Sequence, residues 1–103
     1  MPSIDFRMHT SRLLLELLEY KKSIKILDSI IQEEDERVET WYLLAFCLCK
    51  LKKFQNGEEC MKNVKMLIDK QKITDQEFLS SATELEESLA NGLSKENKQN
   101  QKA

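Results

Sequence analysis

The sequence predicts an all-α protein made of antiparallel helix pairs. Its 103 residues include only two glycines and one proline, which is too few turn residues for many short strands. Lys, Glu and Leu, which are strong helix formers, dominate the composition. Apolar residues recur three and four positions apart over most of the chain, as expected for helices that bury one face. A chain of this length fits one small domain.

Three helices are expected in the first half of the chain. Residues 4–18 are rich in leucine and contain no helix breaker. A tight turn at Tyr20-Lys21-Lys22 leads to a second amphipathic helix over residues 22–33. The polar residues 33–36 then separate it from a helix over residues 38–50, which is apolar on most sides and is therefore predicted to be the most buried.

Two further helices are expected in the second half. Residues 52–54 repeat the earlier turn and precede a helix over residues 56–70. Residues 74–77, Thr-Asp-Gln-Glu, match a capping box, in which Thr74 and Glu77 satisfy the free backbone donors of a helix start. This motif predicts a capping helix over about 74–90.

The end of the chain is predicted to be unstructured. Asn91-Gly92 is a typical helix stop. The following residues 93–103 contain almost no apolar side chains, and we expect them to form a disordered polar tail. The helical domain is thus expected to span residues 1–92.

An internal repeat relates the first two helix pairs. The turn aromatics Tyr20 and Phe54 lie 34 residues apart, which is the period of tetratricopeptide repeats. The predicted repeats span about 4–37 and 38–71, although an irregular bundle with a coincidental spacing would look similar. The second unit places Trp41, Leu44, Ala45 and Leu48 at the pattern's first-helix positions, and the first unit places Arg7, Thr10, Ser11 and Leu14 there.

Composition and motifs argue against several function classes. The net charge of −2 is unlike that of a general nucleic-acid binder. The chain begins with no secretory signal, and no apolar run reaches the roughly 18 residues of a membrane span. Three cysteines in apolar surroundings are typical of reduced core residues, so we expect a cytoplasmic or nuclear protein.

No catalytic or metal-binding constellation is apparent. Cys47 and Cys49 point to different faces of a helix, and neither His9 nor Cys60 lies at a zinc-ligand spacing. A single histidine and the lack of a Gly-rich phosphate loop leave no basis for an active site. We therefore expect no enzyme activity, no cofactor and no small-molecule substrate.

One stretch carries a more specific resemblance. The acidic run 33–36, then Val38-Glu39, then residues 41–44, Trp-Tyr-Leu-Leu, make this part of the chain similar to the C-terminal repeats of a fungal assembly-chaperone family. These tetratricopeptide proteins escort a newly made large-subunit ribosomal protein. The resemblance covers about residues 4–90. It implies that a basic, extended segment of a ribosomal protein would be held in a concave groove.

The repeat positions indicate which residues would line that groove. They place acids beside aromatic and apolar surface, where a basic peptide could find both charge partners and packing. Tyr42 and Phe46 could instead be core residues packed on the fifth helix, and the acidic run 33–36 could be a solvated helix end. The predicted protein-binding residues are Met8, Arg12, Glu16, Glu39, Tyr42, Phe46, Cys49 and Lys50, with Asp5, Leu15 and Glu19 beside them.

The sequence thus favours a protein-binding helical-repeat module, an assembly chaperone or adaptor with a basic client. The alternative is a structural subunit of a complex, held through an uncapped N-terminal face and without a client cycle. A third, weaker hypothesis is nucleic-acid binding through lysines between Lys50 and Lys65, which are interleaved with Glu58 and Glu59.

Overall fold

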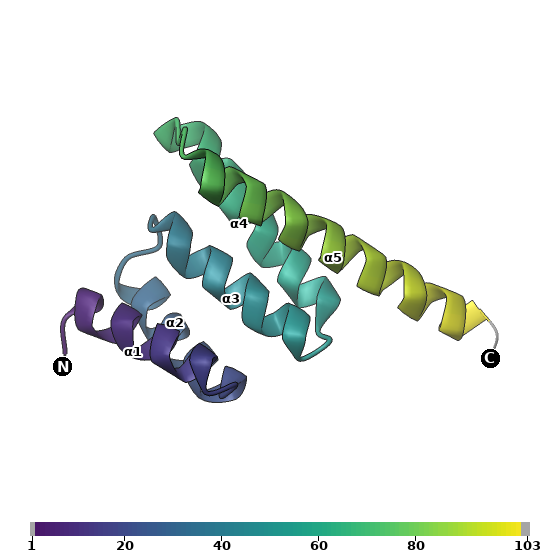
Figure 1. Cartoon of the computed structure of the whole chain (residues 1–103), viewed down its shortest axis with the longest axis horizontal. Helices are drawn as coiled ribbons and strands as arrows, with labels where there is room; N and C mark the ends of the chain where they lie inside the picture. Colours follow the sequence, from purple (N-terminus) through teal and green to yellow (C-terminus); the bar gives the residue numbers. More distant parts are fainter. Residues whose placement is uncertain (1, 102–103) are drawn as a thin grey trace.

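The part of the chain that the structure describes forms five helices in antiparallel order, as the sequence predicts (Figure 1). The structure is a computed structural model that describes the backbone of residues 2–101 and the side chains of residues 2–96. Each helix packs on the next one along the chain, and the last helix also contacts the third. The helices are α1 (Ile4–Glu16), α2 (Tyr20–Glu33), α3 (Val38–Lys50), α4 (Phe54–Gln71) and α5 (Gln76–Gln101).

The turns inside the two pairs have the same geometry at a 34-residue offset. Leu18 and Lys52 both adopt left-handed backbone conformations, with φ of 60° and 61°. The amide of Glu19 donates to the Leu14 carbonyl over 2.8 Å, and the amide of Lys53 donates to the Leu48 carbonyl over the same distance. These bonds satisfy the free carbonyls of a helix end. Both turns lie before Tyr20 and Phe54, which begin the next helices rather than forming the turns as predicted.

Small residues let the two helices of each pair approach closely. In the first pair Ser11 and Ser23 are both fully buried, and the Ser23 hydroxyl donates to the Ser11 carbonyl over 3.2 Å. In the second pair Ala45 and Gly57 occupy the same positions. A Cβ at residue 57 would lie 3.6 Å from the Ala45 carbonyl oxygen and 2.5 Å from Leu89 of α5. Larger side chains at these crossings would push the helices apart.

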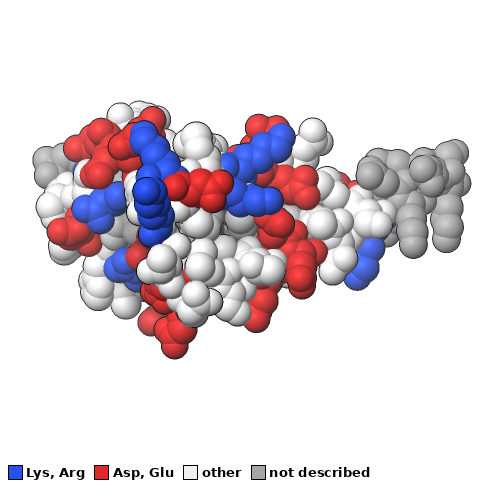
Figure 2. All heavy atoms as spheres, turned by 90° about the horizontal axis from the view of Figure 1, so that it is seen from above, with Lys and Arg blue, Asp and Glu red and all other residues white. Residues whose placement is uncertain are grey.

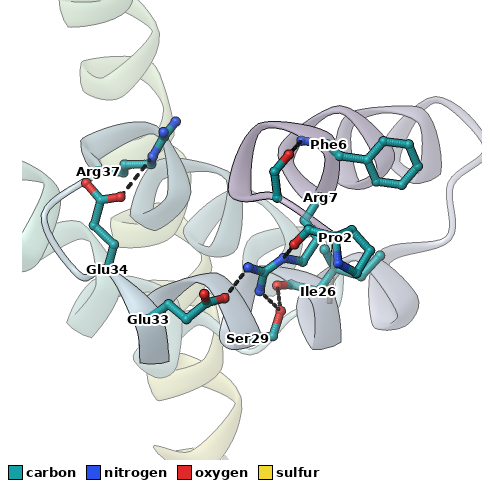
Figure 3. Close-up of polar contacts among 9 residues, drawn as sticks. Pro2, Phe6, Arg7, Ile26, Ser29, Glu33, Glu34 and Arg37 are labelled. Carbon is teal, nitrogen blue, oxygen red and sulfur yellow. Dashed lines mark hydrogen bonds and ion pairs between the residues drawn. The ribbon is translucent and has the colours of Figure 1, made fainter.

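Arg7 fills the tryptophan position of the first repeat (Figure 3). Arg7 is only 7% exposed, and its guanidinium donates to the Pro2 carbonyl and to the Ser29 hydroxyl, each over 3.1 Å. The same group forms an ion pair with Glu33 in the last turn of α2. Trp41 occupies the corresponding position in the second repeat. Its ring packs there, and the indole N–H donates to the Asp35 carbonyl over 2.8 Å.

A single hydrophobic core runs through all five helices. Leu27, Ile30, Val64 and Leu89 are completely buried, one or more from each of α2, α4 and α5. Burying such a side chain stabilises the fold by about 1.5–3 kcal/mol relative to leaving it exposed. Among the described residues, every buried polar side-chain atom has a hydrogen-bond partner.

The start of α5 differs from the prediction by one residue. Asp75, not Thr74, caps this helix, because its carboxylate accepts hydrogen bonds from the amides of Glu77 (3.1 Å) and Phe78 (3.5 Å). A charged carboxylate at a helix N-terminus also interacts favourably with the helix dipole, which explains why Asp75 is preferred to the neighbouring hydroxyl.

The predicted helix stop at Asn91-Gly92 is wrong, since α5 continues through it to Gln101 and extends beyond the other helices (Figure 1). Gly92 has no positive φ and is buried. A Cβ at this position would lie 2.4 Å from the Phe54 ring, so the glycine permits close packing rather than ending the helix. The predicted disordered tail is therefore helical from 93 to 101, and its last two residues lie outside the described part. No helix in the described part of the chain is long and apolar enough to cross a membrane.

Candidate functional site

A concave surface lies between α3 and α5. Its larger hollow has a volume of about 510 Å³ and is lined by Tyr42 and Leu43 of α3 and by Phe78 of α5, with Ile73 at one end. A smaller hollow of about 150 Å³ follows along the same two helices, lined by Phe46, Cys49 and Lys50 on one side. Tyr42 and Ser81 line both hollows, so the two form one continuous groove, which we call the α3–α5 groove.

Aromatic rings form the floor of this groove. The Tyr42 ring packs on Phe78 with 5.4 Å between centroids, and both rings are half-buried. Phe46 packs edge-on against Tyr20 of α2 at 6.5 Å, while the Lys50 ammonium lies 5.4 Å from its ring centroid. Tyr42 and Phe46 are therefore both structural and accessible: each supports a neighbouring helix with one side and lines the groove with the other.

The acids that line the groove come from α5 and its N-cap and from Glu39 of α3, and only Glu39 is among the residues predicted from the sequence. Asp75 and Glu77 line the larger hollow, and Glu84 lines the smaller one. Ser81 and Ser88 also face the groove between and beyond these acids. The sequence does contain a pattern that places these residues on one face: polar side chains at i, i+4, i+7 and i+11 from Glu77 to Ser88, beside the buried stripe of the same helix.

The electrostatic surroundings of Tyr42 reflect its position. Burial raises the pKa of its phenol, a hydrogen bond with Ser81 opposes this rise, and the negative charge of Glu84 adds to it. Partial burial also raises the pKa of the Cys49 thiol, although Lys50 counteracts the effect. The groove thus combines a low-polarity floor with a negatively charged wall.

The first pair contributes less to the groove than predicted. Met8 is only 2% exposed and contacts the Thr40 hydroxyl over 3.5 Å, so it is a core residue and not a binding residue. Arg12 is exposed, but its Nε donates to Glu39 over 2.8 Å, and this ion pair joins α1 to α3. Glu16 is exposed on α1 and is not among the residues that line the α3–α5 groove.

The acidic run 33–36 serves within the molecule. Glu33 pairs with Arg7, and Glu34 pairs with Arg37 over 3.4 Å. Glu36 pairs with Lys70 at the end of α4, and its carbonyl accepts a hydrogen bond from Gln71 over 2.6 Å. Arg37 also reaches Asp5 of α1 over 3.2 Å. These contacts hold the loop between the repeats against both of its neighbours.

The three cysteines are reduced in this structure. Burial raises the pKa of Cys47 and of Cys60 to about 11, which makes both thiols poor nucleophiles at neutral pH. Cys49 is partly exposed in the groove. No group of three or more His, Cys, Asp or Glu side chains within the described residues could hold a metal ion.

Surface charges of both signs are interspersed on the face shown in Figure 2, and no broad basic patch covers it. Lys65 pairs with Glu86 across α4 and α5 over 3.1 Å. The mixed charges on this face give no continuous track for a phosphate backbone there.

Comparison with known proteins identifies the fold family. The family described as "Anaphase-promoting complex, cyclosome, subunit 3", a tetratricopeptide-like family, matches residues 3–64, which is more than half of the chain. The "Probable assembly chaperone of rpl4" of Emericella nidulans is 38% identical over 47 residues. That stretch covers 46% of this chain but only 12% of the relative, so the chain matches a small part of that protein. No solved structure matches significantly.

Proposed function

Since this chain belongs to the tetratricopeptide-like family of anaphase-promoting complex subunit 3, whose modules bind proteins, we propose that it holds a basic, extended protein segment in the α3–α5 groove. The observation that carries the proposal is the pairing of an acidic wall, Asp75, Glu77 and Glu84, with an aromatic floor. Lysine and arginine have long apolar stems and charged ends, so they can pack on the floor and pair with the wall.

The proposed client is a ribosomal protein awaiting assembly. The relative from Emericella nidulans is named as a probable assembly chaperone of rpl4, and the matching stretch supports a similar role here. Ribosomal proteins carry extended basic segments that bind RNA, and an acidic groove would shield them until assembly. This role would place the protein in the cytoplasm or the nucleus.

The test is a binding titration with purified intact rpl4 at two salt concentrations. We expect binding that weakens as salt rises, because exposed charge pairs are screened. Reversing two charges of the wall, Glu77→Lys with Glu84→Lys, should weaken binding by at least about tenfold, since roughly 1.4 kcal/mol of lost charge pairing corresponds to that factor. The matched control is Glu59→Lys with Glu87→Lys, which makes the same change in net charge at two exposed acids outside the groove lining.

Cys49 offers an independent reading of the same site. A client in the groove should slow alkylation of the Cys49 thiol while leaving Cys47 and Cys60 unchanged, because only Cys49 lines the groove. Binding of rpl4 that is insensitive to the double charge reversal and leaves Cys49 open would exclude this groove. A structural subunit without a client cycle would instead co-purify with a fixed partner and show no salt-dependent exchange of rpl4.

A further inference from the structure

A third hollow continues the α3–α5 groove. It has a volume of about 520 Å³ and lies between α5 and the turn that leads into α4. Ser88 lines both this hollow and the smaller hollow of the groove, so the two adjoin. The half-buried ring of Phe54 gives it apolar surface. We call it the Lys52–Lys95 hollow, and its charged residues are Lys52, Lys95 and Glu96.

The charge of the lining changes sign along the three hollows. Among the described residues that line it, the larger hollow of the groove has three acids and no base: Glu39, Asp75 and Glu77. The smaller hollow has one acid and one base, Glu84 and Lys50. The Lys52–Lys95 hollow has two bases and one acid. A molecule that fills all three hollows therefore meets negative charge at one end and positive charge at the other.

Helix dipoles account for only part of this arrangement. α3 and α5 run in the same direction (Figure 1), so both begin at the acidic hollow. Glu39 lies in the first turn of α3 and Lys50 in its last turn, where each complements the dipole of that helix. Lys95 lies more than one turn before the end of α5 at Gln101, where the dipole effect has faded. Its position at the basic end thus calls for another reason.

The lysines at the basic end are free to pair with a bound molecule. Among the ion pairs of the described residues, none involves Lys50, Lys52 or Lys95. All three are exposed, and the Lys50 ammonium lies over the ring of Phe46 instead. Elsewhere the same surface does pair its lysines, as Lys65 does with Glu86.

Building on the proposed use of the groove, we propose that the client segment is bipolar. Its basic side chains lie at the Asp75 and Glu77 end, and an Asp or Glu side chain of the same segment lies in the Lys52–Lys95 hollow. Glu77 and Lys95 are 18 residues apart on α5, which corresponds to about 27 Å along the helix axis. An extended segment covers that distance in about eight residues.

This arrangement makes the groove selective among basic segments. A uniformly basic segment would bring its charges against Lys52 and Lys95, and like charges placed together disfavour the complex. A bipolar segment finds opposite charge at both ends. In the reversed placement both of its ends would meet like charge, so its charges can lie in the groove in only one order.

The test uses synthetic peptides of one length, whose binding to the whole chain is measured by fluorescence anisotropy at low salt. The bipolar probe carries two lysines and, about eight residues further on, two glutamates. In the neutral-ended probe both glutamates are replaced by glutamine, and in the uniformly basic probe by lysine. We expect the bipolar probe to bind about fivefold more tightly than the neutral-ended one, as for two exposed ion pairs, and the uniformly basic probe to bind most weakly.

Reversing the charge of the hollow should reverse this order. In the variant Lys52→Glu with Lys95→Glu, we expect the uniformly basic probe to bind more tightly than the bipolar one. The matched control is Lys21→Glu with Lys25→Glu, which makes the same change in net charge at two exposed lysines of α2 that line none of the three hollows. In the control the bipolar probe should remain the tightest binder.

Three results would overturn the inference. One is equal binding of the bipolar and uniformly basic probes, or an order that the Lys52 and Lys95 changes leave as it was. If Glu77→Lys with Glu84→Lys still weakened every probe, the proposed function would stand without the bipolar client. Another is equal binding of a peptide with the glutamates alone, because the hollow would then serve a separate partner. The last is failure of every probe to bind, and the rpl4 titration would then decide the proposed function by itself.

Discussion

The two helix pairs build one architecture from different side chains. Where the second pair uses a packed indole, Trp41, the first uses the hydrogen-bonded guanidinium of Arg7. Where the second pair crosses on Ala45 and Gly57, the first crosses on two buried serines. Their internal turns nevertheless coincide, with left-handed residues 34 positions apart.

This difference shows which properties the repeat requires. Side-chain size at the crossing and backbone conformation at the turn are kept, whereas chemical identity changes from apolar to polar. A polar substitute is tolerated because every buried donor finds an acceptor, as the contacts of Arg7 show. Each of the following changes tests one of these equivalences.

The crossings should give the largest effect. Ser11→Leu and Ala45→Leu should each lower the free energy of unfolding by about 2–3 kcal/mol, because both residues are fully buried where two helices meet. Chemical denaturation measures the loss, and Ser80→Leu on the exposed face of α5 is the control. A much smaller loss at residue 11 than at residue 45 would mean that the two pairs do not pack alike.

Thiol reactivity should separate two positions that correspond at the 34-residue offset, Leu13 of α1 and Cys47 of α3, by about a hundredfold. Burial raises the pKa of Cys47 to about 11, whereas a thiol introduced by Leu13→Cys is expected near the ordinary value of about 8.5. At pH 8 the new thiol would therefore carry a far larger thiolate fraction, and it would also be more accessible. Alkylation rates, read peptide by peptide with mass spectrometry, measure the ratio. Equal rates would show that residue 13 of α1 is covered in the isolated chain.

Loss of the Arg7 contacts should destabilise the fold somewhat less than a larger side chain at the crossings. Arg7→Ala should lower the free energy of unfolding by about 2 kcal/mol, since it removes three charge-assisted contacts, one of them to Glu33, which is half exposed. Arg7→Met keeps most of the packed stem and should lose less. Thermal unfolding of both variants gives the comparison. If Arg7→Ala melted at the same temperature as the unchanged protein, the guanidinium would not substitute for the indole.

The turns should give the smallest effect, and in the opposite direction. Glycine adopts the left-handed conformation without steric cost, so Leu18→Gly and Lys52→Gly should each stabilise the fold by about 0.5–1 kcal/mol. Both residues are exposed, so little packing is lost. Denaturant midpoints check this, with Lys53→Gly, which lacks a positive φ, expected to destabilise instead.

The sequence predicted the five helices, their order and the pairing at a 34-residue offset, because periodic apolar positions and turn spacing are local properties. It misplaced the end of α5, since Asn91-Gly92 has the composition of a stop. The helix continues because Gly92 packs against Phe54, which lies 38 positions earlier in the chain. Propensity rules do not include such a distant contact.

The candidate site was predicted in part. Tyr42, Phe46, Cys49 and Lys50 line the groove as expected from repeat position. Glu39 also lines the groove, although it pairs with Arg12, 27 positions away, whereas Met8 is buried under α3 and does not reach the surface. The acids of α5 were missed because only the packing of α5 on α3 brings them to the groove.

The ring of Phe54 resting on Gly92 also sets the axial register of α5. If the helix slid by one turn, Ser88 or Glu96 would take the place of the glycine, and their side chains would collide with the ring. The contact between Phe54 and Gly92 therefore fixes the position of α5 along its axis, and with it the positions of Glu77 and Glu84 opposite Tyr42 and Phe46. A methyl group added at residue 92 would shift the charges along the groove without altering any residue that lines their part of it.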